Sequence, residues 1–305
     1  MTMLRSSTLL VTVLFCAGST ALLGQKQAQP AVPEIHLTFT TMDVPGASIT
    51  QPNGINTAGD IVGFYGQSAS GILGGFLCHN GTFNFFNYPG QDETIPGGIN
   101  DSGLIVGSAT QIPSERTTVV GFLYDGANFT TFKDGSNVAT YGLGLNNAGV
   151  VVGEAGTLFS TNAFELVNGH YKTINFPGSY NYGFANSVNS QGLVVGWTIS
   201  GVTDLGYMVK SGRVRDVSIP GAQRTAALGV NDDGIVVGWY NPTTTNDYHG
   251  FALKNGKHFS FDYPGAVWTF ATGINKSGQV VGTYSFDRVA FHGFVTDPIT
   301  TADFK

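Results

Sequence analysis

Residues 98–107 read GINDSGLIVG, and nearly the same ten letters occur six times along this chain. The other copies are GINTAGDIVG at 54, GLNNAGVVVG at 144, SVNSQGLVVG at 187, GVNDDGIVVG at 229 and GINKSGQVVG at 273. Their asparagines are separated by 44, 46, 43, 42 and 44 residues. A period of this length is typical of propeller blades and repeat arrays. Each repeat is therefore expected to form one supersecondary unit.

The repeats have the composition of β-structure. No copy contains the long 3.6-residue periodicity, rich in Ala, Leu, Glu and Lys, that helical repeats need. Each copy instead contains four short strand segments: one that ends at the GIN triplet, one through IVG or VVG, one after GF, and one like FNFFNYPG at 83–90. Four strands in about 44 residues is the pattern of a propeller blade.

The glycine-rich stretch could be a cation loop or a tight turn. A cation site needs carboxylates at fixed places, but only two copies have acids inside the turn, at Asp101 and at Asp232 with Asp233. An Asn side chain can bond the backbone two residues on, and Gly accepts a positive φ, so Asn-x-x-Gly favours a tight hairpin. The stretch is interpreted as scaffold.

The two ends of the chain predict how the ring closes. After the sixth copy the chain ends without a fourth strand, whereas residues 36–47 (HLTFTTMDVPGA) match residues 258–266 (HFSFDYPGA) and precede the first copy. If the N-terminal strand completes the last blade, no free sheet edge remains there. The sequence thus predicts an all-β, six-bladed β-propeller of four-stranded blades over residues 36–297, with a C-terminal tail at 298–305.

Composition and the N-terminus indicate an exported protein. The chain of 305 residues is 42% apolar, only 11% charged, and has a net charge of −6 with 14 Lys plus Arg, so nucleic acid is not an expected partner. Residues 1–29 have the layout of a signal peptide and short linker, with cleavage expected near Ala21 or Gly24. No later segment is long enough to span a membrane. We expect a secreted, extracellular or periplasmic monomer whose single remaining cysteine, Cys78, is buried in a strand and forms no disulfide.

Loop lengths separate two faces of the expected ring. The Asn hairpin has one length throughout, and the hairpin between the third and fourth strands is nearly constant. The link from second to third strand varies, with 11, 13, 9, 9, 11 and 10 residues. These links emerge on the same face as the connections between blades, and variable loops on a rigid scaffold often carry function.

The pattern GINxxGxVVG, followed by a short loop and HGF at His249–Phe251 and His292–Phe294, resembles the HAF family of extracellular repeat proteins. The resemblance covers about residues 37–297. It implies a repeat architecture and an extracellular location, but no catalytic residue, and in four copies the histidine is missing.

Aromatic residues gather at the variable face and suggest a ligand site. Two tryptophans, Trp197 and Trp239, directly follow the second strand, and Trp268 and Tyr240 lie nearby. Such rings suit sugar faces or peptide side chains, and Arg116 and Arg288 would add charged groups. Equally, the rings could wedge adjacent blades apart as core. Threonines four residues before five of the GIN triplets could line a channel, although bracing the turn between blades is favoured.

Candidate catalytic residues are few. Glu154 is the only acid at the position after the second strand, and His249 and His292 begin the third strands of neighbouring blades. No metal motif, nucleophile motif or cofactor motif is present, and neither a metal nor a cofactor is expected. We expect a binding module or scaffold for a carbohydrate, a peptide or an envelope component. The alternative is a polysaccharide- or lactone-acting hydrolase or lyase with Glu154 and a histidine as acid and base.

Overall fold

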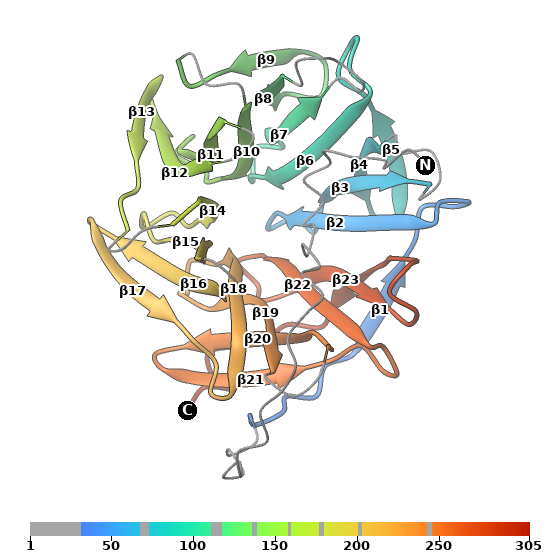
Figure 1. The fold of residues 1–305 in the computed structure, drawn as a ribbon. Coiled ribbons are helices and arrows are strands. Elements are labelled where there is room, and N and C mark those ends of the chain that lie inside the picture. The colour runs from blue at the N-terminus through green and yellow to red at the C-terminus, as the bar shows by residue number, and fades with distance from the viewer. Residues whose placement is uncertain are drawn as a thin grey trace, which may run out of the picture.

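The computed structural model describes residues 32–67, 73–110, 118–135, 139–157, 160–176, 180–200, 203–242 and 246–305. The described residues form 24 β-strands arranged around a common centre (Figure 1). Neighbouring strands pair antiparallel in groups of four, and we number these four-stranded units in chain order. Among the described residues, no helix is both long and apolar enough to cross a membrane.

The first three units follow the chain without a break in order. The first contains β2 (Ile49–Ile55), β3 (Ile61–Gly66), β4 (Leu73–His79) and β5 (Thr82–Phe86). The second contains β6 (Glu93–Ile99), β7 (Ile105–Thr110), β8 (Val119–Tyr124) and β9 (Phe129–Phe132). The third contains β10 (Ala139–Leu145), β11 (Val151–Thr157), β12 (Ser160–Val167) and β13 (His170–Thr173).

The last three units repeat this order, and the sixth takes its outer strand from the start of the chain. The fourth contains β14 (Tyr182–Val188), β15 (Val194–Ser200), β16 (Thr203–Lys210) and β17 (Arg213–Val217). The fifth contains β18 (Ala222–Val230), β19 (Val236–Pro242), β20 (His249–Lys254) and β21 (Lys257–Phe261). The sixth contains β22 (Trp268–Ile274), β23 (Val280–Ser285), β24 (His292–Thr296) and β1 (Phe39–Met42).

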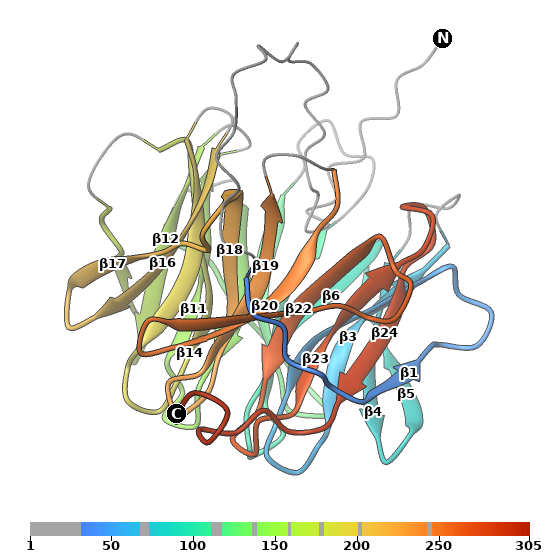
Figure 2. The same ribbon diagram turned by 90° about the horizontal axis from the view of Figure 1, so that it is seen from below.

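Short parallel contacts connect some neighbouring units. Ala139 pairs with Val119, and Thr161 pairs with Tyr182, so the second, third and fourth units form one continuous sheet of twelve strands. Seen from the side, the strands of successive units stand next to one another around the ring (Figure 2).

Both ends of the chain hold the fifth and sixth units together. β1 pairs antiparallel with β24 from Phe39 to Met42, which confirms that the N-terminal strand completes the last unit. In Figure 1 the blue β1 lies beside the red strands of that unit. Before β1, Ile35 N donates to Ser260 O at 2.9 Å, so the chain also touches the outer edge of the fifth unit. The C-terminal segment packs as well, because Ile299 is buried and its N–H donates to Gly278 O at 2.8 Å.

Two glycine positions explain why the motif is glycine-rich; the first is Ser187 in the fourth repeat and glycine in the other five, and the second is glycine in all six. A Cβ on the last glycine of IVG or VVG would collide with a carbonyl oxygen of the first strand, as at Gly63 against Gln51. A Cβ on the glycine of GIN would come within 2.8 Å of the next innermost strand at Gly54. The register also shifts at this point in every innermost strand, which marks a β-bulge. Glycine therefore permits the close approach of innermost strands around the centre.

Candidate functional site

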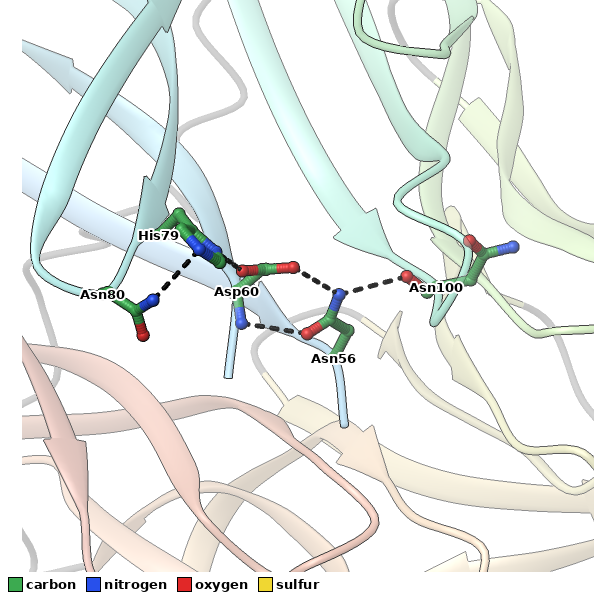
Figure 3. A network of polar contacts seen from close by, with 5 residues as sticks. All are labelled: Asn56, Asp60, His79, Asn80 and Asn100. Carbon is green, nitrogen blue, oxygen red and sulfur yellow. Dashed lines mark hydrogen bonds and ion pairs between the residues drawn. The ribbon is translucent and has the colours of Figure 1, made fainter. Parts of the chain in front are cut away.

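The asparagine of each hairpin forms a closed ring of hydrogen bonds around the centre. Its Nδ2 donates to the backbone carbonyl of the equivalent asparagine in the next unit. The six bonds run Asn56 to Asn100 (3.3 Å), Asn100 to Asn146 (3.4 Å), Asn146 to Asn189 (3.0 Å), Asn189 to Asn231 (3.0 Å), Asn231 to Asn275 (3.2 Å) and Asn275 to Asn56 (3.0 Å). Figure 3 shows the first of these bonds.

The same asparagine also makes the turn. Asn146 Oδ1 accepts from Ala148 N and Val150 N, each at 3.0 Å, while Gly149 adopts a φ of 78°. The equivalent glycine of every repeat has a positive φ. The prediction of a tight Asn-x-x-Gly hairpin is confirmed.

The acids inside these hairpins bridge neighbouring units. Asp101 Oδ1 accepts from Thr57 N, and Asp232 Oδ1 accepts from Ser190 N, both at 2.8 Å. In the part of the chain that the structure describes, no group of three or more His, Cys, Asp or Glu side chains could hold a metal ion. These contacts support the interpretation of the hairpin as scaffold.

The threonines before the GIN triplets brace the turns between units. Four of them accept a backbone N–H from the preceding link through Oγ1: Thr50 from Val44, Thr94 from Tyr88, Thr140 from Asp134 and Thr269 from Tyr263. The distances are 2.8 to 3.1 Å, and all four residues are buried. The favoured interpretation, bracing, agrees with these bonds.

The face opposite the Asn hairpins carries the links between second and third strands, and we call it the variable-loop face. The tryptophans at this face are core residues. Trp197, Trp239 and Trp268 are 7%, 1% and 2% exposed, and Tyr240 is 7% exposed. Of the two alternatives that the sequence left open, platforms for a ligand or core between blades, these exposures agree with core. The indole rings fill the space between the fourth, fifth and sixth units, where Trp197 stacks on Phe184 with ring centroids 4.3 Å apart.

Glu154 is enclosed between strands. Its side chain is 0% exposed, and Thr161 Oγ1 donates to Oε2 at 2.5 Å. Among the described residues, no donor reaches Oε1. Burial raises the pKa of Glu154 to about 8, although the Thr161 hydrogen bond acts in the opposite direction. The carboxyl is therefore protonated at neutral pH.

The two candidate histidines are paired within their own units. His249 Nδ1 lies 2.7 Å from Asp262 Oδ2, and His292 Nδ1 lies 2.9 Å from Asp43 Oδ2. The hydrogen bond to Asp262 raises the pKa of His249 against the opposing effect of burial. Within the described chain, no hydrogen bond or ion pair joins either histidine to Glu154, so the structure does not assemble the acid–base pair of the hydrolase alternative.

Of the two candidate arginines, the structure describes one. Arg288 Nη2 pairs with Asp247 Oδ1 at 3.0 Å, and its guanidinium carbon lies 5.8 Å from the centre of the Trp268 ring. The structure thus brings together two of the expected ligand-binding residues. Arg116 lies outside the described residues.

A cavity opens on the variable-loop face of the first unit. Its volume is about 520 Å³, and Tyr65, Gln67, Asn87, Gln91 and Asp92 supply its side-chain walls. The backbone of residues 45–47, which leads from β1 to β2, forms another wall, and Gln67 Nε2 donates to Gly46 O across it. The cavity therefore lies between two unit-to-unit links and the ends of β3 and β4.

The fifth and sixth units show what fills the corresponding position elsewhere. There a tyrosine pairs in register with a histidine: Tyr240 with His249, and Tyr284 with His292. The ring centroids lie 5.3 and 5.2 Å apart. In the first unit Tyr65 pairs with Gly74, so no imidazole covers the tyrosine ring.

The other residues around the tyrosine also differ in the first unit. Asn87 follows β5 where Asp262 follows β21 in the fifth unit. Phe85, which is 50% exposed, replaces the hydroxyl residue that bonds Tyr240 in the fifth unit, and it packs on Tyr65 at 4.7 Å. Sequence reasoning missed this site. The signal was present as a glycine, Gly74, at the position where two other repeats have histidine.

Comparison with known proteins supports the fold and gives no family. No protein-family model matches the chain, and no curated protein matches it. The resemblance to HAF repeats therefore remains a prediction.

Some solved structures are similar to this chain at low sequence identity. TolB from Acinetobacter baumannii is similar with a TM-score of 0.52 and 11% identity, over 77% of this chain and 63% of that one. YCF48 bound to D1 peptide is similar with a TM-score of 0.47 and 10% identity, over 88% of this chain and 100% of that one. A mutant of Aleuria aurantia lectin in complex with α-methyl-L-fucoside has a TM-score of 0.44 and 10% identity, over 74% and 77% of the two chains. The chain has a β-propeller fold.

Proposed function

We propose that this chain is a closed, six-bladed β-propeller that binds a ligand on its variable-loop face. Support for six blades comes from the strand pairings and from the asparagine ring, whose sixth bond joins Asn275 to Asn56. Each of the six units is then one blade, and β1 completes the last.

The observation that carries the binding role is the cavity of the first unit. A cavity of about 520 Å³ is within the usual range for small-ligand sites, about 300–1,000 Å³. Two of its walls, Tyr65 and Gly74, belong to paired strands, so they are positioned before a ligand arrives. Binding fits the contacts better than catalysis, because Glu154 is enclosed and the two histidines are paired elsewhere.

We also propose export, on the basis of the N-terminal sequence alone. Residues 1–29 read as a signal peptide and a short linker, and they precede the described part of the chain. A secreted binding module would meet carbohydrates, peptides and envelope components outside the cell.

The test is a ligand screen with a variant that fills the cavity. The protein without residues 1–30 is applied to immobilised glycans, peptides and purified envelope polymers. The same screen is run with Gly74→His combined with Asn87→Asp, which introduces the histidine and aspartate of the fifth and sixth units and moves the Tyr65 ring from its place over Gly74. Binding by the natural sequence and its loss in the variant is the expected result.

The matched control introduces the same side chain in another unit. Leu205 is the equivalent position in the fourth unit and is 43% exposed, so Leu205→His should leave both fold and binding intact. Circular dichroism and thermal unfolding confirm that all variants are folded. Equal binding by the natural protein and the filled variant would reject the cavity as the binding site.

A further inference from the structure

We infer that the cavity of the first unit takes a neutral sugar ring, laid against Tyr65 in its wall. The inference rests on the proposed binding function and specifies its ligand. Three features carry it: the aromatic ring of Tyr65, the amide groups around it, and the charge of the walls.

The Tyr65 ring supplies an apolar surface beside polar groups. Tyr240 and Tyr284 have a histidine ring 5.3 and 5.2 Å away, respectively, whereas the Tyr65 ring lies over Gly74, where a Cβ would come within 2.8 Å of it. Phe85, half exposed, adds a second aromatic surface next to Tyr65. A pyranose ring has a comparable pairing of chemistry, with C–H groups on its face and hydroxyls on its rim. Aromatic rings with adjacent polar groups suit such a ligand.

The amide groups match hydroxyls. Asn87 and Gln91 each have a carboxamide, which contains both donors and an acceptor. A hydroxyl group is also both donor and acceptor, so the two can pair in either direction. A ligand rich in hydroxyls can therefore satisfy these walls without any ionised group of its own.

The charge of the walls disfavours an anion. None of the described residues that line the cavity is Lys, Arg or His, and Asp92 contributes a negative charge. A carboxylate or phosphate would lose its hydration without gaining a cationic partner. A neutral sugar is therefore preferred over an acidic one.

The test uses single sugars, so that binding in one cavity can be measured without contacts from the rest of a longer glycan. Saturation-transfer NMR is recorded with methyl glucoside, galactoside, mannoside and fucoside, and with glucuronic acid as the acidic probe. We expect transfer to the ring protons of at least one methyl glycoside and weaker binding of glucuronic acid. Tyr65→Ala should weaken the binding by roughly tenfold or more, whereas Tyr65→Phe should retain it. Gly74→His with Asn87→Asp should abolish it, and Leu205→His should not.

Each outcome decides between the ligand class and the binding function. If a peptide binds and the filled variant blocks it while no methyl glycoside binds, the binding function stands and the sugar is wrong. If glucuronic acid binds more tightly than every neutral glycoside, the argument from charge is wrong. If a glycoside binds equally to the filled variant, the sugar is held elsewhere and the inference fails. If nothing binds the natural protein, both proposals fail.

Discussion

The asparagine of each repeat stabilises both its own hairpin and the junction with the next unit. Through Oδ1 it closes its own hairpin, and through Nδ2 it holds the next unit. Neither aspartate nor serine can do both, because aspartate at neutral pH has no donor and serine is too short to replace the amide. This double role accounts for the presence of asparagine in all six copies, while the residues around it vary.

Glu154 provides a test of the enclosed carboxyl. Because its pKa in the folded protein is about 8 against an ordinary value of 4.5, the folded state holds one more proton than the unfolded state between these values. Stability therefore falls as the pH rises through that window, by up to about 1.4 kcal/mol per pH unit. Glu154→Gln has no proton to lose, so its stability relative to the natural protein should increase with pH.

The measurement is urea denaturation at one-unit pH steps across the window. The control is Glu165→Gln on β12, where the carboxylate pairs with exposed Lys172 and removal should cost less than about 1 kcal/mol. A constant difference between Glu154→Gln and the natural protein at every pH would contradict an elevated pKa.

At the scale of single residues, the sequence predicted the roles of some residues and not of others. The hairpin chemistry of Asn146 and Gly149 is local, so it could be predicted from six neighbouring letters. The bond from Asn146 to Asn189 joins two units, and no local pattern indicates it. The burial of Trp197 and Trp239 also could not be decided, because both core packing and ligand binding favour large aromatic rings.

β1 is the element on which the sixth unit depends. It pairs with β24, and Phe39 packs edge-on against Phe294 with ring centroids 5.3 Å apart and against Tyr263 at 5.4 Å. Phe39→Ala should destabilise the protein by about 2–4 kcal/mol, because it removes a partly buried aromatic ring that contacts two units. The measurement is the free energy of unfolding in urea.

Phe85→Ala is the matched substitution. Phe85 belongs to the outer strand of the first unit, as Phe39 does in the sixth, but it is half exposed at the edge of the cavity. It should cost less than Phe39→Ala by at least about 1 kcal/mol. Equal costs would show that β1 contributes no more than an ordinary outer strand.

The elements were predictable in number and order, but less so in length. The third and fourth units have the shortest links between second and third strands, and there the strands extend into long hairpins: Thr157 pairs with Ser160, and Ser200 pairs with Thr203. The sequence indicates only a C-terminal tail at 298–305, and in the structure Phe304 of this tail is buried and packs on Phe259. Both differences come from tertiary packing, which a repeat pattern does not contain.

At the scale of the whole molecule, the asparagine ring joins the sixth unit to the first by the same kind of hydrogen bond that joins every other pair of neighbouring units. Asn275→Asp removes the donor that reaches Asn56, and Asn146→Asp removes the donor that reaches Asn189; both bonds are 3.0 Å long. Each variant retains the Oδ1 acceptor. We expect both to lower the free energy of unfolding by about 1–3 kcal/mol, and by amounts that agree within about 0.5 kcal/mol.

Urea denaturation monitored by tryptophan fluorescence measures the two costs and the cooperativity together. A single transition of unchanged slope is expected for both variants. A second transition, or a smaller slope for Asn275→Asp alone, would show that the junction opens separately and that the ring is weaker there.

The closure by β1 also sets an order of events during synthesis. The hydrogen bond from Thr38 N to Asp297 Oδ1 spans 259 residues, so β1 leaves the ribosome long before its partner strand β24 is made. At about 5–20 residues per second, the nascent first strand waits roughly 13 to 50 s for that partner. Throughout this interval its hydrogen-bonding edge is open to other chains. A long exposure of this edge to other chains during synthesis is the consequence of pairing β1 with a strand that lies so far along the sequence.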